Sequence, residues 1–256
     1  SNVPTNEGFY RLIDVHAPEG TVVHAKPPVG VVGGWEVAMR LCDLAFLAFS
    51  DAMPERVMAS TKSINCHMAC GGTDPRNGEQ YAFIETLAGG YGARPTKDGM
   101  DAVQSHIQNT ENSAIEETEN NYPFMITRYE LIPDSEGPGR TRGGLGVRRD
   151  WKFIDHSTTL TIFSDNRKNA PWGLFGGGSA SPSKYILNPD EESAELPSKI
   201  THQPEPGDTI SYRTPGGGGY GPVQERDPDA VRKDVLAGKI SVEWAEKAYG
   251  MRFKQG

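Results

Sequence analysis

Two amides and a carboxylate recur at a spacing of three to four residues, at Asn109, Asn112 and Glu116. If this stretch is helical, the three side chains lie on one face within two turns. The amides could then bind the amide group of a substrate, and the carboxylate could act as a general acid or base. The surrounding sequence is polar and acidic, so a solvated loop without a chemical role is an equally good interpretation.

A second candidate lies in the stretch 137–178, where two segments rich in glycine and arginine flank one strand-like run. Glycine permits positive φ angles and close backbone approach, and the arginine fork binds carboxylates and phosphates. The pattern predicts a polar, positively charged surface with Arg140, Arg142 and Arg167 as candidate ligand-binding side chains. Asp165 stands two residues before Arg167, and the two either act on a ligand or form an internal ion pair that fixes the loop.

The motif Cys66-His67-Met68-Ala69-Cys70 offers two thiols and an imidazole to a metal ion. A closed zinc site needs four ligands, usually from two separated pairs. The sequence contains no second pair. We therefore interpret the motif as buried small residues and expect no metal ligands in this chain.

Charge and cysteine content restrict the class of protein. The 256 residues carry a formal net charge of −8, with a pI near 5.3, which argues against nucleic-acid binding because such proteins usually present a basic face. The three cysteines are an odd number that suits a reducing compartment, so we expect a cytoplasmic protein. The sequence shows neither a run of about 18 apolar residues nor a signal-peptide pattern, so we expect no membrane association.

Hydrophobic periodicity predicts an α+β fold whose β-rich body is mainly antiparallel. Apolar residues recur at helical spacing between residues 34 and 50, which predicts a long helix. Asp98 could cap a short helix that runs through His106. Strand-like runs separated by turn residues are expected at 9–24 around a turn at Pro18-Glu19-Gly20, and at 81–86, 124–132, 183–188, 200–203 and 209–213.

The last 30 residues predict a helical hairpin. Asp227, with Pro228 at the first helical position, starts a helix that ends before Gly238. Ser241 caps a second helix that extends through Tyr249. The amphipathic pattern of both helices favours packing or partner binding over catalysis.

An extreme glycine run lies in the segment 214–221. It lacks the Gly-Lys-Ser/Thr ending of a P-loop and the strand-to-helix context of a dinucleotide fingerprint. The segment is therefore either a disordered linker or a backbone that passes close to something else. We divide the chain into a mixed α/β segment with a glycine-rich loop (1–123), a β-rich segment (124–222) and a C-terminal helical hairpin (223–256), which together form one structural unit.

Taken together, these motifs resemble the C-terminal part of the hydantoinase B family. That family includes the B-type component of ATP-dependent N-methylhydantoinase, the corresponding region of 5-oxoprolinase, and the α-type subunits of acetone and acetophenone carboxylases. The order and number of the motifs carry the resemblance over nearly the whole chain. The most similar motifs are Asn109-Thr110-x-Asn112-x-x-x-Glu116, Gly139-Arg140-x-Arg142-Gly143-Gly144-Leu145-Gly146, Asp165-x-Arg167, Pro171-Trp172-Gly173-Leu174-x-Gly176-Gly177 and Thr214-Pro215-Gly216-Gly217-Gly218-Gly219-Tyr220-Gly221.

The resemblance implies a component of an ATP-dependent cyclic-amide hydrolase of the hydantoinase or oxoprolinase type. A separate A-type subunit would bind ATP with Mg and phosphorylate the amide oxygen, and the B-type part would complete the hydrolysis. An amide is a poor electrophile, and acid–base catalysis alone contributes about 100- to 10,000-fold. Two alternatives remain open: the α-type subunit of an ATP-dependent ketone carboxylase, and a non-catalytic assembly module.

One departure from the family pattern shapes the expected assembly. The family's metal-binding motif of the His-His-x-Asp kind, which lies in its N-terminal half, is absent from this sequence. The resemblance therefore implies a divalent metal ion in a missing N-terminal half, and a hetero-oligomer of that half with the A-type subunit. Within such a site, Asn109 and Asn112 would hold the ring amide, Glu116 would position water and Arg167 would face the phosphorylated oxygen.

Overall fold

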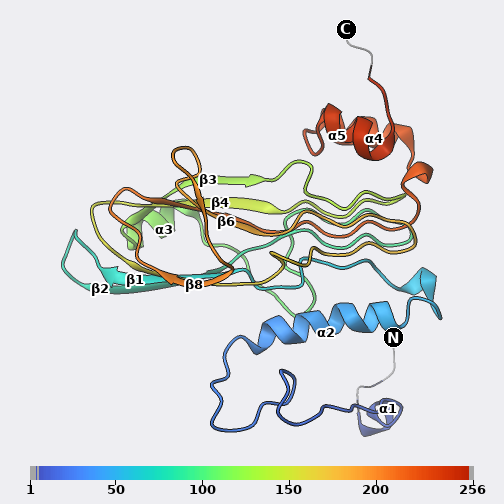
Figure 1. Cartoon of the computed structure of the whole chain (residues 1–256), viewed down its shortest axis with the longest axis horizontal. Coiled ribbons are helices and arrows are strands. Elements are labelled where there is room, and N and C mark those ends of the chain that lie inside the picture. Colours follow the sequence, from blue (N-terminus) through green and yellow to red (C-terminus); the bar gives the residue numbers. More distant parts are fainter. Residues whose placement is uncertain (1–3, 5, 254–256) are drawn as a thin grey trace.

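Two antiparallel sheets face each other in the computed structural model of the chain, which describes residue 4 and residues 6–253, with only the backbone of Phe9 (Figure 1). The first sheet has the order β2-β1-β5-β8 and consists of β1 (His67–Thr73), β2 (Gln80–Thr86), β5 (Thr159–Phe163) and β8 (Lys199–His202). The second has the order β3-β4-β9-β6-β7 and consists of β3 (Phe124–Leu131), β4 (Val147–Phe153), β6 (Lys184–Leu187), β7 (Ala194–Glu195) and β9 (Thr209–Arg213).

The main hydrophobic core fills the space between the sheets, because alternate residues of each strand point inward. Met68 of β1 and Trp151 of β4 are both completely buried there. The rings of Tyr185 and Tyr212 meet edge to face, with their centroids 4.5 Å apart. Since β1 pairs with β5, the segments 1–123 and 124–222 share one sheet and one core.

Beside the sandwich, a second body consists of extended segments that run side by side without forming a sheet (Figure 1). We call it the glycine bundle; its segments are 57–63, 88–93, 98–103, 135–146, 171–178 and 214–221. Backbone hydrogen bonds join the segments directly: Gly217 N donates to Gly144 O at 2.9 Å, and Gly218 N donates to Ser60 O at 2.8 Å.

Segment 214–221 touches four other segments of the glycine bundle and therefore lies at its centre. A Cβ atom on Gly143 would lie 1.7 Å from the carbonyl oxygen of Gly217, and one on Gly218 would lie 2.0 Å from that of Trp172. Only glycine allows such backbone approach, as at the axis of the collagen triple helix. The linker interpretation is thus wrong, and the alternative of a closely approached backbone is confirmed.

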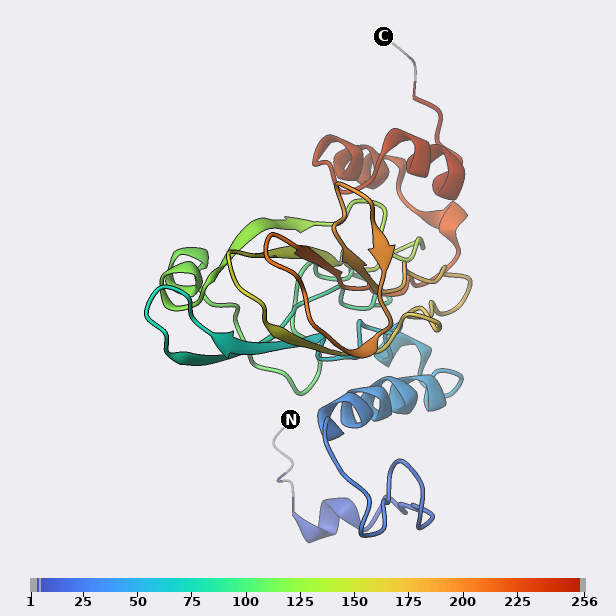
Figure 2. The same cartoon turned by 60° about the vertical axis from the view of Figure 1, so that its left-hand side comes forward.

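Helix α2 (Gly34–Ala48) lies along one side of the molecule, and the C-terminal hairpin of α4 (Pro228–Leu236) and α5 (Val242–Tyr249) lies on the opposite side (Figure 2). Among the described residues before α2, the short α1 (Glu7–Tyr10) is the only helix, and the rest consists of turns and extended segments. The remaining helical elements are η1 (Pro54–Arg56), η2 (Val223–Glu225) and α3 (Ile115–Asn121), which packs beside β3. Among the described residues, no helix combines the length and hydropathy needed to cross a membrane.

The caps predicted from the sequence form as expected. The Asp227 carboxylate accepts a hydrogen bond from Asp229 N, and the Ser241 hydroxyl accepts one from Trp244 N. The hairpin is anchored to the glycine bundle, because Trp244 Nε1 donates to Glu136 Oε1 at 2.6 Å. The α+β, mainly antiparallel fold and the long helix after residue 34 are likewise confirmed.

Three element predictions are wrong. Residues 9–24 form no strands; only the turn is present, with Gly20 at φ 78° and an isolated bridge between Thr21 and His24. No helix runs from Asp98 to His106, because the Asp98 carboxylate binds the Arg226 guanidinium instead of capping a helix. The stretch 137–178 contains two strands, β4 and β5, rather than one.

Candidate functional site

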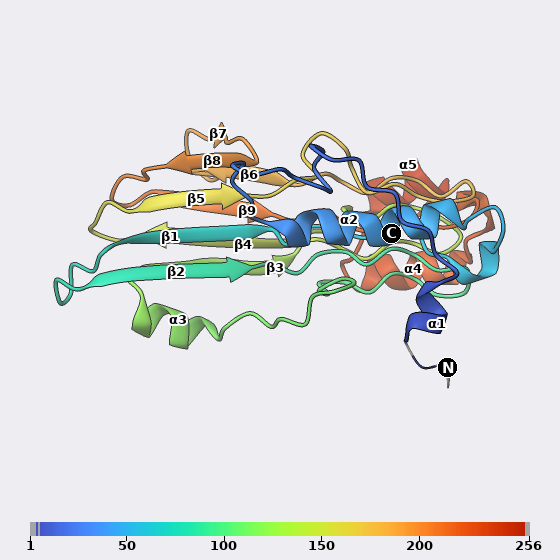
Figure 3. The same ribbon diagram turned by 90° about the horizontal axis from the view of Figure 1, so that it is seen from below.

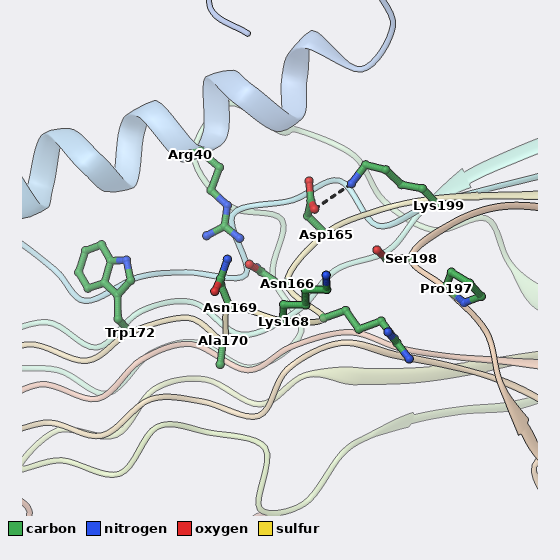
Figure 4. Close-up of a pocket in the computed structure, with 11 residues that line it drawn as sticks. Arg40, Asp165, Asn166, Lys168, Asn169, Ala170, Trp172, Pro197, Ser198 and Lys199 are labelled. Atoms are coloured by element: carbon green, nitrogen blue, oxygen red, sulfur yellow. Dashed lines mark hydrogen bonds and ion pairs between the residues drawn. The ribbon is translucent and has the colours of Figure 1, made fainter. Parts of the chain in front are cut away.

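A pocket of about 750 Å³ lies between α2 and the loops that follow β5 and precede β8 (Figure 4). Its lining includes four cationic side chains and a single carboxylate: Arg40, Arg167, Lys168, Lys199 and Asp165. This local excess of positive charge is notable in a chain whose formal net charge is −8. We call it the cationic pocket.

Arg40 supplies the charge from the side of α2. Its side chain points from the helix toward Asn169 (Figure 4). The described residues offer it neither a hydrogen bond nor an ion pair. Burial lowers the pKa of Arg40 from its usual value, while the nearby Asp43 and Asp165 carboxylates oppose that shift. An arginine that is half-buried and unpaired retains its whole donor fork for a ligand.

Asp165 and Arg167 both line the cationic pocket but do not pair with each other. Lys199 Nζ donates to Asp165 Oδ1 at 2.8 Å, and Arg167 Nε donates to Glu195 Oε1 at 3.0 Å. The internal ion pair considered from the sequence is therefore not present. Both contacts are partly exposed, so solvent screens them and a ligand can compete with them.

Asn166 connects the pocket loop to the glycine bundle. Its backbone is left-handed, with φ 59°, and its side chain is only 3% exposed. The amide nitrogen donates to the carbonyl oxygen of Lys62. The amide oxygen is buried and has no partner among the described residues. Because a buried polar atom without a partner is costly, this acceptor is suited to a donor group on a ligand.

The amide and carboxylate motif predicted from the sequence lies elsewhere. Residues 107–114 are not helical, and α3 begins only at Ile115, so Asn109, Asn112 and Glu116 do not share one helical face. Asn109 and Asn112 line a separate pocket of about 410 Å³. Glu116 is exposed on α3, which packs beside β3 at the edge of the second sheet, whereas the cationic pocket includes Lys199 of β8, at an edge of the first sheet.

Asn112 already has several hydrogen-bonding partners. Its Nδ2 donates to Glu85 Oε1 at 2.8 Å and to the carbonyl oxygen of Thr86 at 3.0 Å. Its Oδ1 accepts from the Tyr129 hydroxyl at 3.0 Å. These contacts give Asn112 a clear role in joining the loop to β2 and β3, whereas Asn109 is exposed.

Arg140 and Arg142 lie in the glycine bundle, outside the lining of the cationic pocket. Arg142 is only 3% exposed and forms ion pairs with Asp101 at 3.0 Å and Asp234 at 3.1 Å. Arg140 is more exposed and pairs with Glu225 at 3.2 Å. Arg142 therefore joins the bundle to the C-terminal hairpin through buried charges.

The cysteine motif does not converge on a common point. Cys66 and Cys70 both face the core, whereas His67 points to the opposite face, as strand alternation requires. Burial raises the pKa of both thiols to about 12, which keeps them protonated. Within the described part of the chain, no three His, Cys, Asp or Glu side chains are grouped as metal ligands.

Sequence patterns indicate only part of the cationic pocket. Asp165 and Arg167 belong to the motif loop, and Lys168 and Asn169 stand directly beside them. Arg40 and Lys199 are not predicted, because a single basic residue in a helix or strand has no local signal. They reach the pocket only through the packing of α2 and β8 against this loop.

The comparisons with known proteins agree in identifying one family. A family model described as Hydantoinase B/oxoprolinase matches residues 1–223. The putative D-/L-hydantoinase of Pseudomonas sp. strain NS671 has a B-type component that is 33% identical over 253 residues, which cover 98% of this chain and 42% of that protein.

Solved structures give the same result. The ATP-dependent caprolactamase from Pseudomonas jessenii matches with a TM-score of 0.85 and 28% identity, over 99% of this chain and 46% of that chain. Nucleotide-free acetone carboxylase matches in fold alone, with a TM-score of 0.69 and 22% identity. This match covers 81% of this chain and 32% of the acetone carboxylase chain. The chain thus spans less than half the length of each of these three proteins. Since the family model covers most of the sequence, the resemblance is confirmed, and the chain belongs to the hydantoinase B/oxoprolinase family.

Proposed function

We propose that this chain is part of an ATP-dependent enzyme that hydrolyses the C–N bond of a cyclic amide. The observation that carries the proposal is the cationic pocket, in which the unpaired Arg40 faces the family motif Asp165-x-Arg167. A cyclic amide activated by phosphorylation carries a dianionic group. A pocket with four cations and one carboxylate suits such a group electrostatically.

The residues of the chain have distinct roles in this proposal. Arg40 and Arg167 donate to the phosphoryl oxygens and stabilise the charge that develops on them. Lys199 holds Asp165 at the edge of the pocket at 2.8 Å, where the carboxylate can accept a proton from the attacking water. The buried oxygen of Asn166 accepts a hydrogen bond from the ring N–H.

Asn109, Asn112 and Glu116 remain proposed contributors rather than members of this pocket. Asn109 lines the smaller pocket, where it could bind an extended substrate. Asn112 acts by positioning Glu85 and Tyr129, which it contacts directly. Glu116 is exposed on α3, so any contribution to a site requires that another polypeptide cover this surface.

ATP with Mg and a divalent metal ion belong to other parts of the proposed assembly. The described residues lack a grouped set of metal ligands, so in this proposal the residues of this chain bind and orient the substrate without a metal ion of their own. ATP would be used by an A-type subunit, which transfers the phosphoryl group to the amide oxygen before hydrolysis. We place the assembly in the cytoplasm, because all three cysteines are free thiols.

Substrate-stimulated ATP hydrolysis by the complete enzyme tests the proposal. We expect stimulation by hydantoins, 5-oxoproline or lactams, together with ring opening. Stimulation only by a ketone with bicarbonate would instead favour the carboxylase alternative, which the fold-level match to acetone carboxylase keeps in consideration. Unchanged turnover after loss of the pocket arginines would favour a non-catalytic assembly module.

A further inference from the structure

Helix α2 departs from the polarity of an ordinary surface helix. Its inner stripe includes two buried carboxylates, Glu36 and Asp43, beside the buried Met39, and Asp43 Oδ1 accepts from His106 Nε2 at 2.6 Å. Its outer face is apolar and exposed, with Leu41, Leu44 and Leu47 at helical spacing. A surface helix normally buries its apolar stripe and exposes its polar one. The outer face of α2 is therefore built to be covered.

The N-terminal arm, residues 6–33, extends the same apolar surface. Figure 3 shows it running beside α2, and Figures 1 and 2 show that it lies on the far side of α2 from the two sheets. Of the 24 large hydrophobic side chains that are exposed among the described residues, 14 lie between Tyr10 and Phe49. Leu12 is 86% exposed and Val32 is 84% exposed. Such a concentration marks an interaction surface rather than scattered exposure.

An apolar pocket separates the arm from the start of α2. Its volume is about 430 Å³, and its lining includes Val22, Val29, Val32 and Val37. Between residues 11 and 32, the hydrogen bonds and ion pairs among the described residues join residues that are near one another in sequence, such as Lys26 and Glu19 at 2.5 Å. Residues 11–32 of the arm therefore have the composition of buried structure but remain largely exposed.

We propose that the arm and the outer face of α2 form the docking surface for the region of a B-type protein that this chain does not span. We call this region the complementary B region. The alignment with the hydantoinase B relative covers 98% of this chain but only 42% of that relative. The caprolactamase match likewise covers 99% of this chain and 46% of the matched caprolactamase chain. More than half of a B-type polypeptide is thus available to cover the surface.

This docking surface lies next to the cationic pocket. Arg40 belongs to α2 and lines the pocket from the inner side of that helix. A polypeptide seated on the outer face of α2 would border the same opening and limit the access of water to it. The proposal goes beyond the proposed reaction, because it rests on exposed apolar side chains and family membership rather than on catalysis.

Thiol labelling of the native assembly tests the proposal. The test variant Leu44→Cys and the control variant Leu236→Cys are each made in a Cys42→Ser background. Leu236 serves as the control because it is 87% exposed on α4. Each variant is labelled both as the isolated chain and in the assembly. We expect maleimide labelling at position 44 to slow at least tenfold in the assembly, and labelling at position 236 to change less than twofold. Equal labelling at position 44 in both states would overturn the proposal.

A charge substitution identifies what covers the surface. We expect Leu44→Asp to weaken binding of the complementary B region at least tenfold by native mass spectrometry, and Leu236→Asp to change it less than twofold. Both variants should keep their melting temperature within a few degrees, because both side chains are exposed. If Leu44→Asp instead abolishes only self-association of the chain, or only binding of the ATP-binding subunit, the assigned occupant is wrong. These readouts do not depend on turnover, so they separate this proposal from the proposed reaction.

Discussion

Lys199 Nζ holds the carboxylate of Asp165 at 2.8 Å, across the gap between the β5 loop and β8. Arg40, on the opposite wall of the same pocket, has no such partner among the described residues. This asymmetry separates the two cations: Lys199 positions a protein group, whereas Arg40 remains available to a ligand. The roles of the pocket residues can therefore be tested one by one.

Replacement of Arg40 should impair turnover without affecting the fold. We expect Arg40→Ala to lower kcat/KM of the complete enzyme by about 100-fold, the usual effect of losing one preorganised charged donor. Arg232→Ala is the matched control, because the exposed Asp229 on α4 is the only ion-pair partner of Arg232 in the described part of the chain. Steady-state kinetics and thermal melts check both variants, and a change below twofold in Arg40→Ala would remove Arg40 from the site.

Arg167 and Glu116 test the residues inferred from the family motifs. Arg167→Lys keeps the charge but loses the planar fork, so we expect a loss of turnover of at least tenfold. Glu116→Gln should give a similar loss if Glu116 meets water or a ligand in the assembly. Turnover within about twofold of the wild type for either variant would show that the role assigned to that residue is wrong.

The two bundle arginines should differ in their effect on stability. Removing Arg142 deprives the carboxylates of Asp101 and Asp234 of a buried partner, although Asp101 keeps Lys239 and Asp234 keeps Arg226. We therefore expect Arg142→Ala to lower the free energy of unfolding by about 1.5–3 kcal/mol. Arg140→Ala should lower it by less than about 1 kcal/mol, because the Arg140 pair is exposed. Denaturant unfolding measures both. Equal effects would contradict the structural role of Arg142.

Glycine substitutions test the close packing of the glycine bundle. In Gly143→Ala the new methyl group would lie 1.7 Å from the carbonyl oxygen of Gly217, so we expect a loss of about 3 kcal/mol or more in unfolding free energy. Gly30→Ala is the control, because no atom beyond its two neighbours in the chain lies within 4 Å of its Cβ position. A Gly143→Ala variant as stable as Gly30→Ala would refute this packing.

The pH dependence of stability should reveal the buried Glu136. Burial raises the pKa of Glu136 from 4.5 to about 7, although Trp244 Nε1 donates to its carboxylate. Between these values the folded chain binds more protons than the unfolded chain. The contribution to stability is therefore complete below pH 4.5 and is lost as the pH rises through 7. We expect Glu136→Gln to remove about 2–3 kcal/mol of this pH dependence, measured by unfolding at pH 4.5 and pH 8. If the unfolding free energies of the wild type and Glu136→Gln changed with pH in parallel, Glu136 would not be the source of this pH dependence.

The sequence predicts elements whose signals are local. Ser241 and Asp227 cap their helices as expected, and β9 forms where alternation indicates a strand. The glycine bundle could not be predicted, because a glycine run is compatible with both disorder and tight packing. Asp98 misled the helix prediction because a carboxylate suits both a helix cap and a buried ion pair, and only the distant Arg226 decides between them.

The cationic pocket has the same mixture of local and distant signals. Asp165 and Arg167 stand in one motif, so the sequence indicates them together. Arg40 precedes them by more than 120 residues in the sequence, and it meets them only because α2 packs beside the loop that carries them. The apolar stripe therefore correctly predicts that α2 is a helix, but only the structure shows that this stripe faces outward.

Isotope transfer from the substrate tests the central claim most directly. A cyclic amide with ¹⁸O in its carbonyl group is incubated with the complete enzyme and ATP, and the inorganic phosphate is examined by mass spectrometry. If the amide oxygen is phosphorylated and then leaves with the phosphoryl group, each ring opened yields one ¹⁸O-labelled phosphate. In Arg40→Ala, the rate at which labelled phosphate forms should fall in parallel with the rate of ring opening. Ring opening that releases only unlabelled phosphate would contradict the account.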